Sequence, residues 1–405
     1  MDVKTAYLYG ELDEEIYMDQ PEGFKVKGKE HLVCRLIKAI YGLKQAGRQW
    51  NKKLHETLLD LGFKRTYSDA GVYVYHSKKR DLILVVYVDD LLPIGPNKKH
   101  ISEIKQKLQE RFKVRDLGPI KSFLGMNVER DRAKQIIWLD QSKYVEEILQ
   151  RFGMHNSKPS NTPLPSGAHI VKADPEVDKL DRKLRTQYQQ LIGSLLWVAL
   201  GTRPDIAYAV NRLSQHNAHP TQQHFKFAQY VLRYLNGTRS LRVSYQGQSQ
   251  SGLIAYSDSD WAENKDDRHS TSGYVFFMAD GPVSWVSRRQ KTVALSSTEA
   301  EYMQLSDTCR HTAWLRTFVS ELGYPPTGPT PICGDNQGAI FLAVNPAHDR
   351  RTKHIDIRYH FIRDFVEEGK AKLYYVPTEI MVADILTKPL GRELQERHTK
   401  LLSLE

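Results

Sequence analysis

Two adjacent carboxylates, Asp89 and Asp90, follow a long apolar run in this chain. The run covers residues 82–88 and is rich in β-branched side chains, a pattern that predicts a buried strand. Carboxylates at the tip of such a strand cannot stay buried without a partner, because removing even one of them from water is costly. The pair therefore predicts either a solvated acidic turn or a site that binds a cation.

Four further acidic residues fall at the ends of elements predicted in the last third of the chain: Asp258, Glu301, Asp335 and Asp384. Asp258 and Asp335 end apolar strands, and Asp384 opens a closing helix from about residue 382. With no balancing base nearby, such carboxylates would repel one another and their pKa values would rise. Two Mg²⁺ ions about 3.5–4 Å apart would satisfy them and would activate water for phosphodiester cleavage. Mn²⁺ is the alternative ion.

Two glutamates compete for the place at the head of the long predicted helix. Residues two apart on a helix point about 200° apart, so Glu299 and Glu301 cannot both face one site. Glu301 heads a stripe that continues through Leu305 and is expected to meet the sheet, whereas Glu299 suits the positive end of the helix dipole. We choose Glu301, with Glu299 as the alternative. Asp260 is the corresponding rival of Asp258.

Composition bounds the class of protein. With 405 residues, of which 40% are hydrophobic, the chain can form two to three domains. No apolar stretch approaches the roughly 18 residues of a membrane span, so we expect no membrane association. Cys34, Cys309 and Cys333 are odd in number and far apart, which favours a reducing compartment over a disulfide framework.

The positive charge is concentrated in the first part of the chain. Residues 1–250 hold 40 Lys/Arg and 27 Asp/Glu, whereas residues 251–405 hold 18 and 21. Residues 151–250 alone hold 13 and 5. A basic block beside an acidic catalytic part suits an enzyme that holds a polyanion and processes it with metal ions. An ordinary solvated basic surface is the alternative.

Apolar periodicity predicts the elements that must position these residues. In the first part we expect helices at 39–62, 98–112 and 141–152, strands at 72–76 and 82–88, and hairpin-like segments near 121–130 and 135–140. Residues 156–181 are predicted to be a Pro-rich linker. Helices are predicted at 182–200 and 205–236, with their aromatic residues mainly in the helix core.

From residue 251 the pattern changes to a three-stranded meander followed by alternating helices and strands. Strands are predicted at 252–258, 271–279, 282–287, 330–335 and 371–376, and helices at 298–322, 336–345 and 355–368. The whole chain is therefore assigned to the mixed α/β class, with α+β character.

Residues 87–90 resemble the Tyr-x-Asp-Asp motif that reverse transcriptases carry in a hairpin of the polymerase palm. Residues 1–10 resemble the neighbouring strand that bears the third family carboxylate. The similarity is to copia-type retrotransposon polymerases, and it continues through residues 17–24, 41–50 and 123–126. These segments together are far more specific than any one of them.

This resemblance implies roles for individual residues. Asp2, Asp89 and Asp90 would bind the metal ions for attack of a primer hydroxyl on an incoming nucleotide. Tyr7 would block a ribose 2′-hydroxyl, and Gln45 is a weaker candidate for a nucleotide contact. The hairpin residues Phe123, Leu124, Gly125 and Met126 would form the primer grip. The implied partners are an RNA template, a DNA primer, dNTP and an RNA–DNA hybrid.

Residues 251–390 resemble the ribonuclease H domain of the same elements, including residues 256–261 and 353–358. The implied organisation is a palm-like reverse transcriptase subdomain at 1–155, a linker at 156–181, a thumb- or connection-like helical region at 182–250, the mixed-sheet ribonuclease H domain at 251–390, and a tail at 391–405. The loop at 377–382 lacks the histidine that related enzymes often carry. His354 is a weak substitute.

The resemblance implies Mg²⁺-dependent cleavage of RNA in an RNA–DNA hybrid, with two ions in each active site. Since the chain starts one residue before Asp2, we expect the fingers subdomain to be missing. DNA polymerisation is then the ancestral activity of the first half. The alternative is an inactive nucleic-acid-binding remnant. A cytoplasmic retroelement particle is the implied location, with the nucleus as the alternative.

Overall fold

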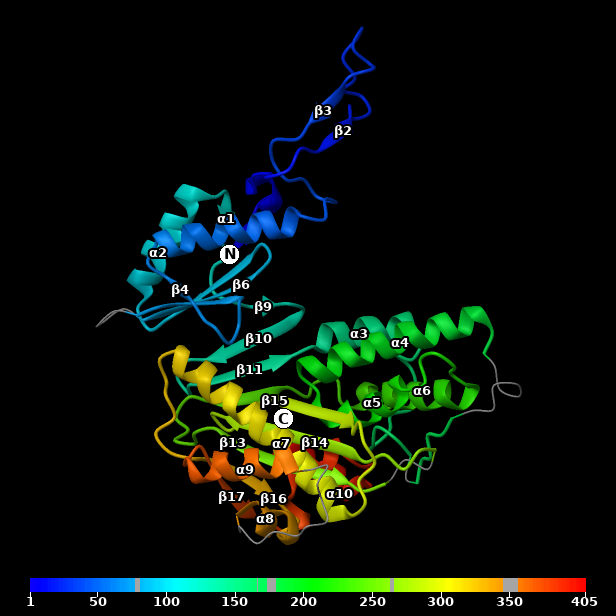
Figure 1. Ribbon diagram of the computed structural model, residues 1–405. Helices are drawn as coiled ribbons and strands as arrows, with labels where there is room; N and C mark the ends of the chain where they lie inside the picture. The colour runs from blue at the N-terminus through cyan, green and yellow to red at the C-terminus, as the bar shows by residue number, and fades with distance from the viewer. Residues whose placement is uncertain (77–80, 166, 173–179, 263–265, 345–355) are drawn as a thin grey trace. The chain divides into compact units, whose positions relative to one another are not determined.

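The computed structural model describes residues 1–76, 81–165, 167–172, 180–262, 266–344 and 356–405 (Figure 1). The chain divides into two compact units. Unit 1 comprises Met1–Pro119 and Trp314–Pro325, and unit 2 comprises Ile120–Ala313 and Pro326–Glu405. Sheets and helices occur in both units, which confirms the predicted α/β class. Within the described ranges, no helix is both long and apolar enough to cross a membrane.

Unit 1 is built on a six-stranded sheet of order β4-β5-β6-β7-β1-β8. Its elements are β1 (Asp2–Val3), η1 (Ala6–Tyr9), β2 (Tyr17–Asp19), β3 (Val33–Arg35), α1 (Ala46–Asp60), β4 (Lys64–Arg65), β5 (Val72–Tyr75), β6 (Leu82–Tyr87), β7 (Asp90–Ile94), α2 (Lys98–Arg111) and β8 (Val114–Arg115). Helix α1 begins seven residues later than predicted. Gly42 has a φ of 96°, which no right-handed helix accommodates.

One hydrophobic core joins the sheet of unit 1 to both of its helices. Trp50 and Leu54 of α1 pack in this core with Ile104 and Leu108 of α2 and with Leu84 of β6. Helices α1 and α2 are thereby fixed against the strands on either side of the Asp89-Asp90 turn.

A two-residue turn, Val88-Asp89, joins β6 to β7. Val88 has a φ of 53°, a left-handed conformation that a β-branched residue rarely adopts. Its carbonyl oxygen accepts a hydrogen bond of 2.6 Å from the indole nitrogen of Trp50. The packed helix α1 therefore holds the strained turn that carries the two carboxylates.

Pro93 lies in β7 opposite Leu84 of β6. The backbone N–H of Leu91, which has the same orientation as position 93, donates to the carbonyl of Met1 on the β1 side. Strand β1 pairs with β7 at Asp90. The N–H that Pro93 lacks would thus point to the β1 side of β7, so the proline leaves the ladder between β6 and β7 intact.

The helical layer of unit 2 contains α3 (Ser142–Arg151), α4 (Arg182–Gly201), η2 (Pro204–Ile206), α5 (Ala207–Ser214) and α6 (Gln222–Gly237). The single helix predicted at 205–236 is wrong. Helix α5 ends at Ser214, and turns follow at 215–219 before Pro220, which disfavours helical backbone in the residue that precedes it. A new helix starts after Thr221, whose side chain accepts the N–H of His224 while the His224 ring accepts the N–H of Thr221.

Two sheets complete unit 2. One has the order β12-β11-β10-β9, formed by β9 (Ser122–Phe123), β10 (Met126–Asp131), β11 (Ile136–Asp140) and β12 (Val243–Gln246); the sequence did not predict β12. The other has the order β15-β14-β13-β16-β17, formed by β13 (Ile254–Asp260), β14 (Thr271–Met278), β15 (Gly281–Arg289), β16 (Thr330–Gly334) and β17 (Ala371–Tyr375). Helices α7 (Ser297–Glu321), α8 (Gln337–Val344) and α9 (Asp356–Glu367) alternate with its later strands.

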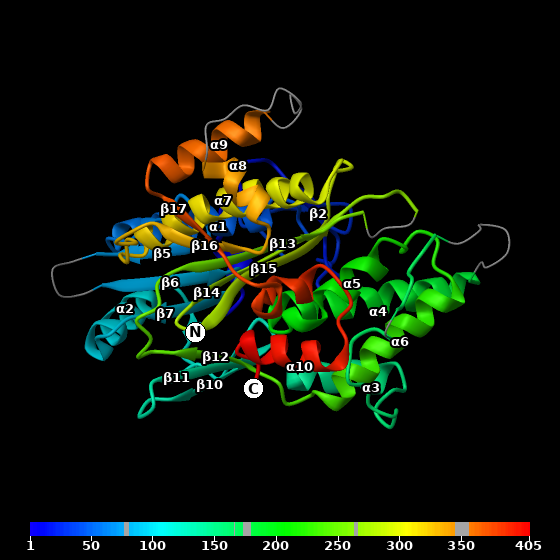
Figure 2. The ribbon, with the colours of Figure 1, turned by 90° about the horizontal axis from the view of Figure 1, so that it is seen from below.

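Strand β14 is buried on both faces. Tyr274 and Phe276 lie against the His311 ring of α7. Val275 and Phe277 point the other way, into the core that contains α4, α5 and α6. Figure 2 shows α7 and these helices on opposite sides of the strands. Because both faces are covered, the strand has a continuous apolar run rather than an alternating one.

The C-terminal part differs from the prediction. Residues from 382 form a short 3₁₀ segment, η5 (Val382–Leu386), and the α-helix α10 (Arg392–Leu401) begins only after Pro389. Residues 391–405, predicted to be a tail, are folded. Leu402 and Leu404 are buried in the main core of unit 2, and Leu404 bridges to Val243.

Candidate active sites

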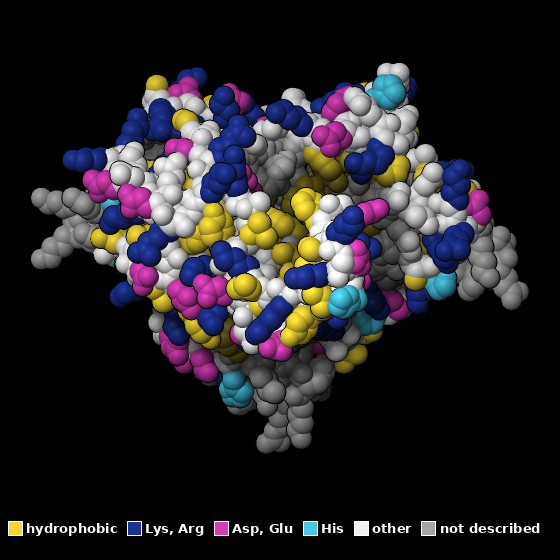
Figure 3. Space-filling view, turned by 90° about the horizontal axis from the view of Figure 1, so that it is seen from above, with side chains coloured by type: hydrophobic (Ala, Val, Ile, Leu, Met, Phe, Trp, Pro, Cys, Tyr) yellow, Lys and Arg dark blue, Asp and Glu magenta, His cyan; other side chains and the backbone are white. Residues whose placement is uncertain are grey.

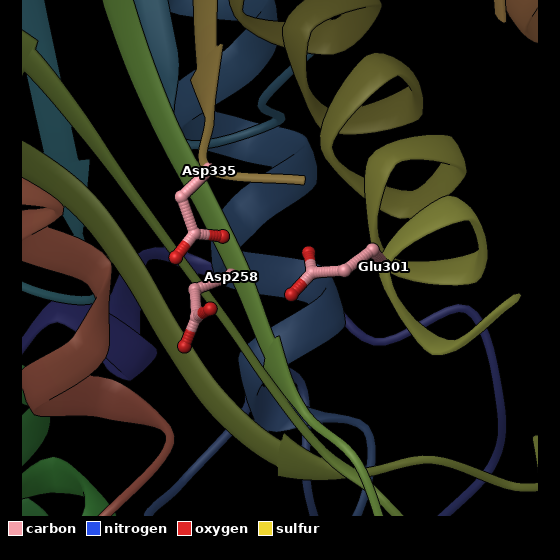
Figure 4. A group of neighbouring side chains, drawn as sticks. All are labelled: Asp258, Glu301 and Asp335. Carbon is pink, nitrogen blue, oxygen red and sulfur yellow. The ribbon is translucent and has the colours of Figure 1, made fainter. Parts of the chain in front are cut away.

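Three carboxylates from three elements of unit 2 meet at one place (Figure 4). Asp258 lies in β13, Glu301 in α7, and Asp335 directly after β16, with one ligand atom of each within 4.8 Å of the others. Strands β13 and β16 are parallel neighbours with Ala255 opposite Ile332, and the same register continued by three residues brings Asp258 opposite Asp335. Within the described ranges, this is the only such group of His, Cys, Asp or Glu side chains.

The structure separates the two glutamates of α7. Glu301 faces the sheet, and its Oε1 accepts the N–H of Ser259 at 3.0 Å. Glu299 instead caps its own helix, since its Oε2 accepts the N–H of Leu295 at 2.9 Å and its N–H donates to the hydroxyl of Ser296 at 3.1 Å. The geometry therefore brings Glu301, and not Glu299, to Asp258. Asp260 lies outside the three-carboxylate group.

The fourth predicted carboxylate, Asp384, lies in η5 and not at the start of the last helix. Its Oδ2 is 3.0 Å from the ammonium of Lys388, and its Oδ1 is buried without a hydrogen-bond partner. The assumption that no balancing base is nearby is thus wrong. Lys388 follows Asp384 by four residues, a spacing that was readable from the sequence. Asp384 does not belong to the group of three.

Neighbouring hydroxyl groups hold these carboxylates. Thr378 donates to Asp335 at 2.8 Å, and Thr387 donates to Asp258. Neither threonine was predicted to contribute, because Thr378 lies in the short 3₁₀ segment η4 (Thr378–Ile380), Thr387 directly follows η5, and both contacts depend on how these irregular segments pack. The side chain predicted as a weak substitute for the missing histidine, His354, lies outside the described residues.

Burial and mutual repulsion perturb the acids. Burial, followed by the charges of Asp258 and Asp335, raises the pKa of Glu301 well above its usual value. Burial, followed by the charge of Asp258, also raises the pKa of Asp335, and the same two causes raise the pKa of Asp384 to about 8. Burial alone would lower the pKa of Lys388, but the charges of Asp258 and Asp384 raise it above its usual value.

These residues fit a hard divalent cation. The donors are all carboxylate oxygens, which Mg²⁺ prefers. Burial and the mutual repulsion of the acids raise the pKa values of Glu301 and Asp335, and the buried Oδ1 of Asp384 lacks a hydrogen-bond partner. Asp258, Glu301 and Asp335 would hold such an ion, and Asp384 would contribute to a second.

Stability of the metal-free protein should fall as the pH rises from about 5 to about 8. An acid whose pKa is raised by folding keeps its proton in the folded state and loses it in the unfolded state, so the free energy of unfolding decreases with pH up to the folded pKa. Asp384, with its pKa of about 8, acts in this window. We expect thermal melts in EDTA to show the decrease, Mg²⁺ to remove it, and Asp384→Asn to weaken it. A melting temperature that rises equally in both proteins would contradict this assignment.

In unit 1, Asp2 of β1 is paired directly with Asp90 of β7, and the N–H of Val3 donates to the carbonyl of Asp89 at 2.8 Å. Burial, then the charges of Asp89 and Asp2, raise the pKa of Asp90. The hairpin and the neighbouring strand thus place all three predicted carboxylates at one end of the sheet. Their ligand atoms, however, do not form a group as compact as that of unit 2.

The predicted nucleotide contacts are only partly brought together. Tyr7 packs on Tyr41 with ring centroids 4.6 Å apart, and with Trp50 and Val88 it lines a cavity of about 230 Å³ beside the turn. Gln45 precedes α1, lies 3.5 Å from Glu14 and does not line this cavity. The structure therefore gives Gln45 no place beside Tyr7.

The predicted primer grip forms the tight connection from β9 to β10 in unit 2. Phe123 and Met126 are paired across it, while Leu124 and Gly125 have φ angles of 49° and 76°. A side chain added at Gly125 would meet the indole of Trp197 on α4. Trp197 is 46% exposed, whereas Tyr208, Phe227 and Tyr234 are buried, so the prediction that the aromatics of these helices are mainly core residues is wrong for Trp197 and right for these three.

The palm-like sheet of unit 1 and the carboxylate-bearing sheet of unit 2 are the two parts of a nucleic-acid-processing enzyme by descent. Residues 1–166 match the family model "Reverse transcriptase (RNA-dependent DNA polymerase)". The chain is 36% identical to the putative transposon Ty5-1 protein of Saccharomyces cerevisiae, over 76% of this chain and 99% of that protein. It belongs to the copia-type retrotransposon Pol family, as predicted.

Two plant relatives are longer. The chain is 41% identical to the Pol polyprotein of transposon TNT 1-94 of Nicotiana tabacum, over 100% of this chain and 30% of the relative. The chain is 40% identical to the Pol polyprotein of transposon RE1 of Arabidopsis thaliana, over 97% of this chain and 26% of the relative. The chain thus spans less than a third of the length of these relatives.

Similar solved structures include ribonuclease H1 of Halobacterium salinarum, at 17% identity over 34% of this chain and 95% of that chain, with a TM-score of 0.26. The foamy viral protease-reverse transcriptase in complex with dsDNA matches at 14% identity over 93% of this chain and 67% of that chain, with a TM-score of 0.21.

Proposed function

We propose that unit 2 hydrolyses the RNA strand of an RNA–DNA hybrid with Mg²⁺ held by Asp258, Glu301, Asp335 and Asp384. The observation that carries this proposal is the meeting of three carboxylates from β13, α7 and the end of β16 within 4.8 Å. When bound, the metal supplies an activated water and stabilises the charge that develops on the leaving oxygen.

The residues around the metal position keep the carboxylates in place. The backbone N–H of Ser259 fixes Glu301, and the hydroxyls of Thr378 and Thr387 fix Asp335 and Asp258. Preorganised oxygens avoid reorganisation at the moment of reaction, which is where such a site gains most of its rate. Burial of Asp258 and Glu301 leaves few waters to compete for these oxygens.

Purified protein should cleave a labelled RNA–DNA hybrid in Mg²⁺, and Asp335→Asn should lose most of that activity. The substitution removes one charged ligand of the three-carboxylate group while keeping the side-chain shape. Gel analysis of the labelled RNA strand measures both rates. Absence of cleavage by the wild type, or equal cleavage by both proteins, would leave the non-catalytic nucleic-acid-binding remnant as the function.

We further propose that α4 carries the nucleic-acid-binding face of residues 182–250. Its solvent-facing stripe runs from Arg182 through Gln189 and Gly193 to Trp197. Glycine costs roughly 1 kcal/mol in a helix interior, and a side chain at position 193 would meet nothing in the chain. A smooth stripe between a basic end and an exposed indole suits close approach of a sugar–phosphate backbone. Lys and Arg side chains are also spread over the face seen in Figure 3.

Trp197→Ala should weaken hybrid binding about tenfold, the loss expected when one aromatic contact to a nucleotide is removed. Because the indole is 46% exposed, the melting temperature should stay close to that of the wild type. Fluorescence anisotropy with a labelled hybrid measures the affinity. Tyr67→Ala, which removes a ring that is 95% exposed, is the matched control. Equal affinities of the two variants would remove Trp197 from the interface.

For unit 1 we propose the palm of an RNA-directed DNA polymerase, with Asp2, Asp89 and Asp90 as metal ligands and Tyr7 beside the incoming dNTP. Separately, we propose that Phe123–Met126 act as a primer grip. The direct pairing of Asp2 with Asp90 favours the polymerase as a second function. Primer extension on an RNA template tests it, with Asp90→Asn as the inactive control.

A further inference from the structure

Lys388 places a positive charge inside the acidic site of unit 2. Its ammonium nitrogen lies 3.0 Å from Oδ2 of Asp384, and about two-thirds of its side chain is covered. Among the ion pairs between described residues, only this one includes a member of the set Asp258, Glu301, Asp335 and Asp384. The metal-free site therefore contains its own cation.

The ion pair divides the four carboxylates into two sets. Asp258, Glu301 and Asp335 form the compact group, whereas Asp384 does not belong to it. One oxygen of Asp384 is engaged by Lys388, and the other is buried without any hydrogen-bond partner. A buried carboxylate oxygen without a donor is destabilising, so Asp384 is only half satisfied in this state.

We propose that Lys388 is a positioning residue that acts as an internal counter-ion of Asp384 and controls occupancy of the second metal position. One divalent cation binds to Asp258, Glu301 and Asp335 while the ion pair is intact. A second cation binds through Asp384 only when the ammonium of Lys388 has left that carboxylate. This inference rests on the metal site of the proposed function.

Competition for the same oxygens is the physical basis. An ammonium and a divalent cation cannot share Oδ2 of Asp384, and their charges repel each other across the site. The four-carbon stem of lysine is flexible, so its ammonium can move without a change of backbone. A nucleic-acid strand offers phosphate oxygens as a new partner, and its binding would release Asp384. Substrate binding and second-metal binding would then favour each other.

A purely structural role makes a different prediction. Asp384 and Lys388 are four residues apart at the junction of η5 and α10, where an ion pair of this spacing can stabilise the local fold. Removal of such a pair would lower stability but would leave the number and affinity of bound metal ions unchanged.

The test is a titration of the full chain with Mn²⁺ in the absence of nucleic acid, followed by isothermal calorimetry and by the EPR signal of free Mn²⁺. We expect one Glu301-dependent site in the wild type, counted apart from any ion that Asp2, Asp89 and Asp90 of unit 1 hold. Lys388→Met should bind a second ion, or should tighten the weaker site on the order of tenfold. Lys388→Arg, which keeps the charge, and Lys400→Met, which removes an exposed lysine of α10, should resemble the wild type.

A second measurement uses the wild type alone, so that a folding defect of Lys388→Met does not prevent a decision. Addition of a hybrid with a 2′-O-methylated RNA strand, which resists cleavage, should raise the number of Glu301-dependent Mn²⁺ ions from one to two. If the wild type binds Mn²⁺ in a Glu301-dependent manner but neither Lys388→Met nor the hybrid alters the titration, the inference is overturned. If the wild type binds no Mn²⁺ at all, the proposed metal-dependent function itself fails.

Discussion

Glu301→Gln should lower the rate of hybrid cleavage by at least about 100-fold, whereas Glu299→Gln should change it by less than about twofold. The two residues lie in the same turn of α7 and differ in what they touch. Glu301 faces Asp258 and Asp335, so its loss removes a charged metal ligand, which is worth several kcal/mol in the transition state. Glu299 binds the backbone of its own helix end.

The order of the two variants should reverse when stability is measured: Glu299→Gln should be less stable than the wild type, and Glu301→Gln should not. Glu299→Gln weakens a cap that joins Leu295 to the start of α7, at an expected loss of about 0.5–1 kcal/mol. Glu301→Gln removes a buried like charge next to two others, so the metal-free protein should become more stable at neutral pH. Single-turnover cleavage and thermal melts in EDTA measure the two quantities. Greater loss of cleavage in Glu299→Gln would reverse the assignment.

The choice between these glutamates could be made from the sequence because it depends on local geometry. Two residues that are two positions apart on a helix cannot face the same site, and the stripe headed by Glu301 indicates which side meets the sheet. Asp258 and Asp335 were likewise readable from strand ends. The ion pair of Lys388 with Asp384 was missed, since the closing segment was taken for one regular helix and only its packing shows that the ammonium enters the site.

Other differences have the same origin. The polar face of α7 that meets the sheet includes Gln304 and Thr308, which bind Gly273 and Ser257. Apolar periodicity cannot detect such a buried polar face. Trp197 was assigned to the helix core by its residue type, although its exposure depends on what covers α4. Strand β12 was not predicted because four residues pair with β11, which lies about a hundred residues earlier in the chain.

The largest loss of stability is expected from Arg203→Met. Arg203 is 2% exposed and forms two hydrogen bonds with the carboxylate of Asp205, at 2.9 and 2.7 Å. It also donates to the backbone carbonyl and the hydroxyl of Thr238, at 2.9 and 2.7 Å, at the end of α6. The Tyr234 hydroxyl donates to the carboxylate of Asp205 at 2.8 Å, and the side chain of Gln395 in α10 donates to the backbone carbonyl of Asp205. The guanidinium thus connects η2 with the end of α6, and Asp205 extends the network to α10 through its backbone carbonyl.

Removal of this guanidinium leaves the carboxylate of Asp205 buried with a single neutral donor, Tyr234, and such a broken pair is destabilising by about 3–5 kcal/mol. Urea denaturation followed by circular dichroism measures the loss. Arg182→Met, at the exposed start of α4, should change stability by less than about 0.5 kcal/mol. The double variant with Asp205→Leu should regain part of the loss, because an apolar pair leaves no unpaired charge. If Arg203→Met were no less stable than Arg182→Met, the buried network would not be what joins these helical segments.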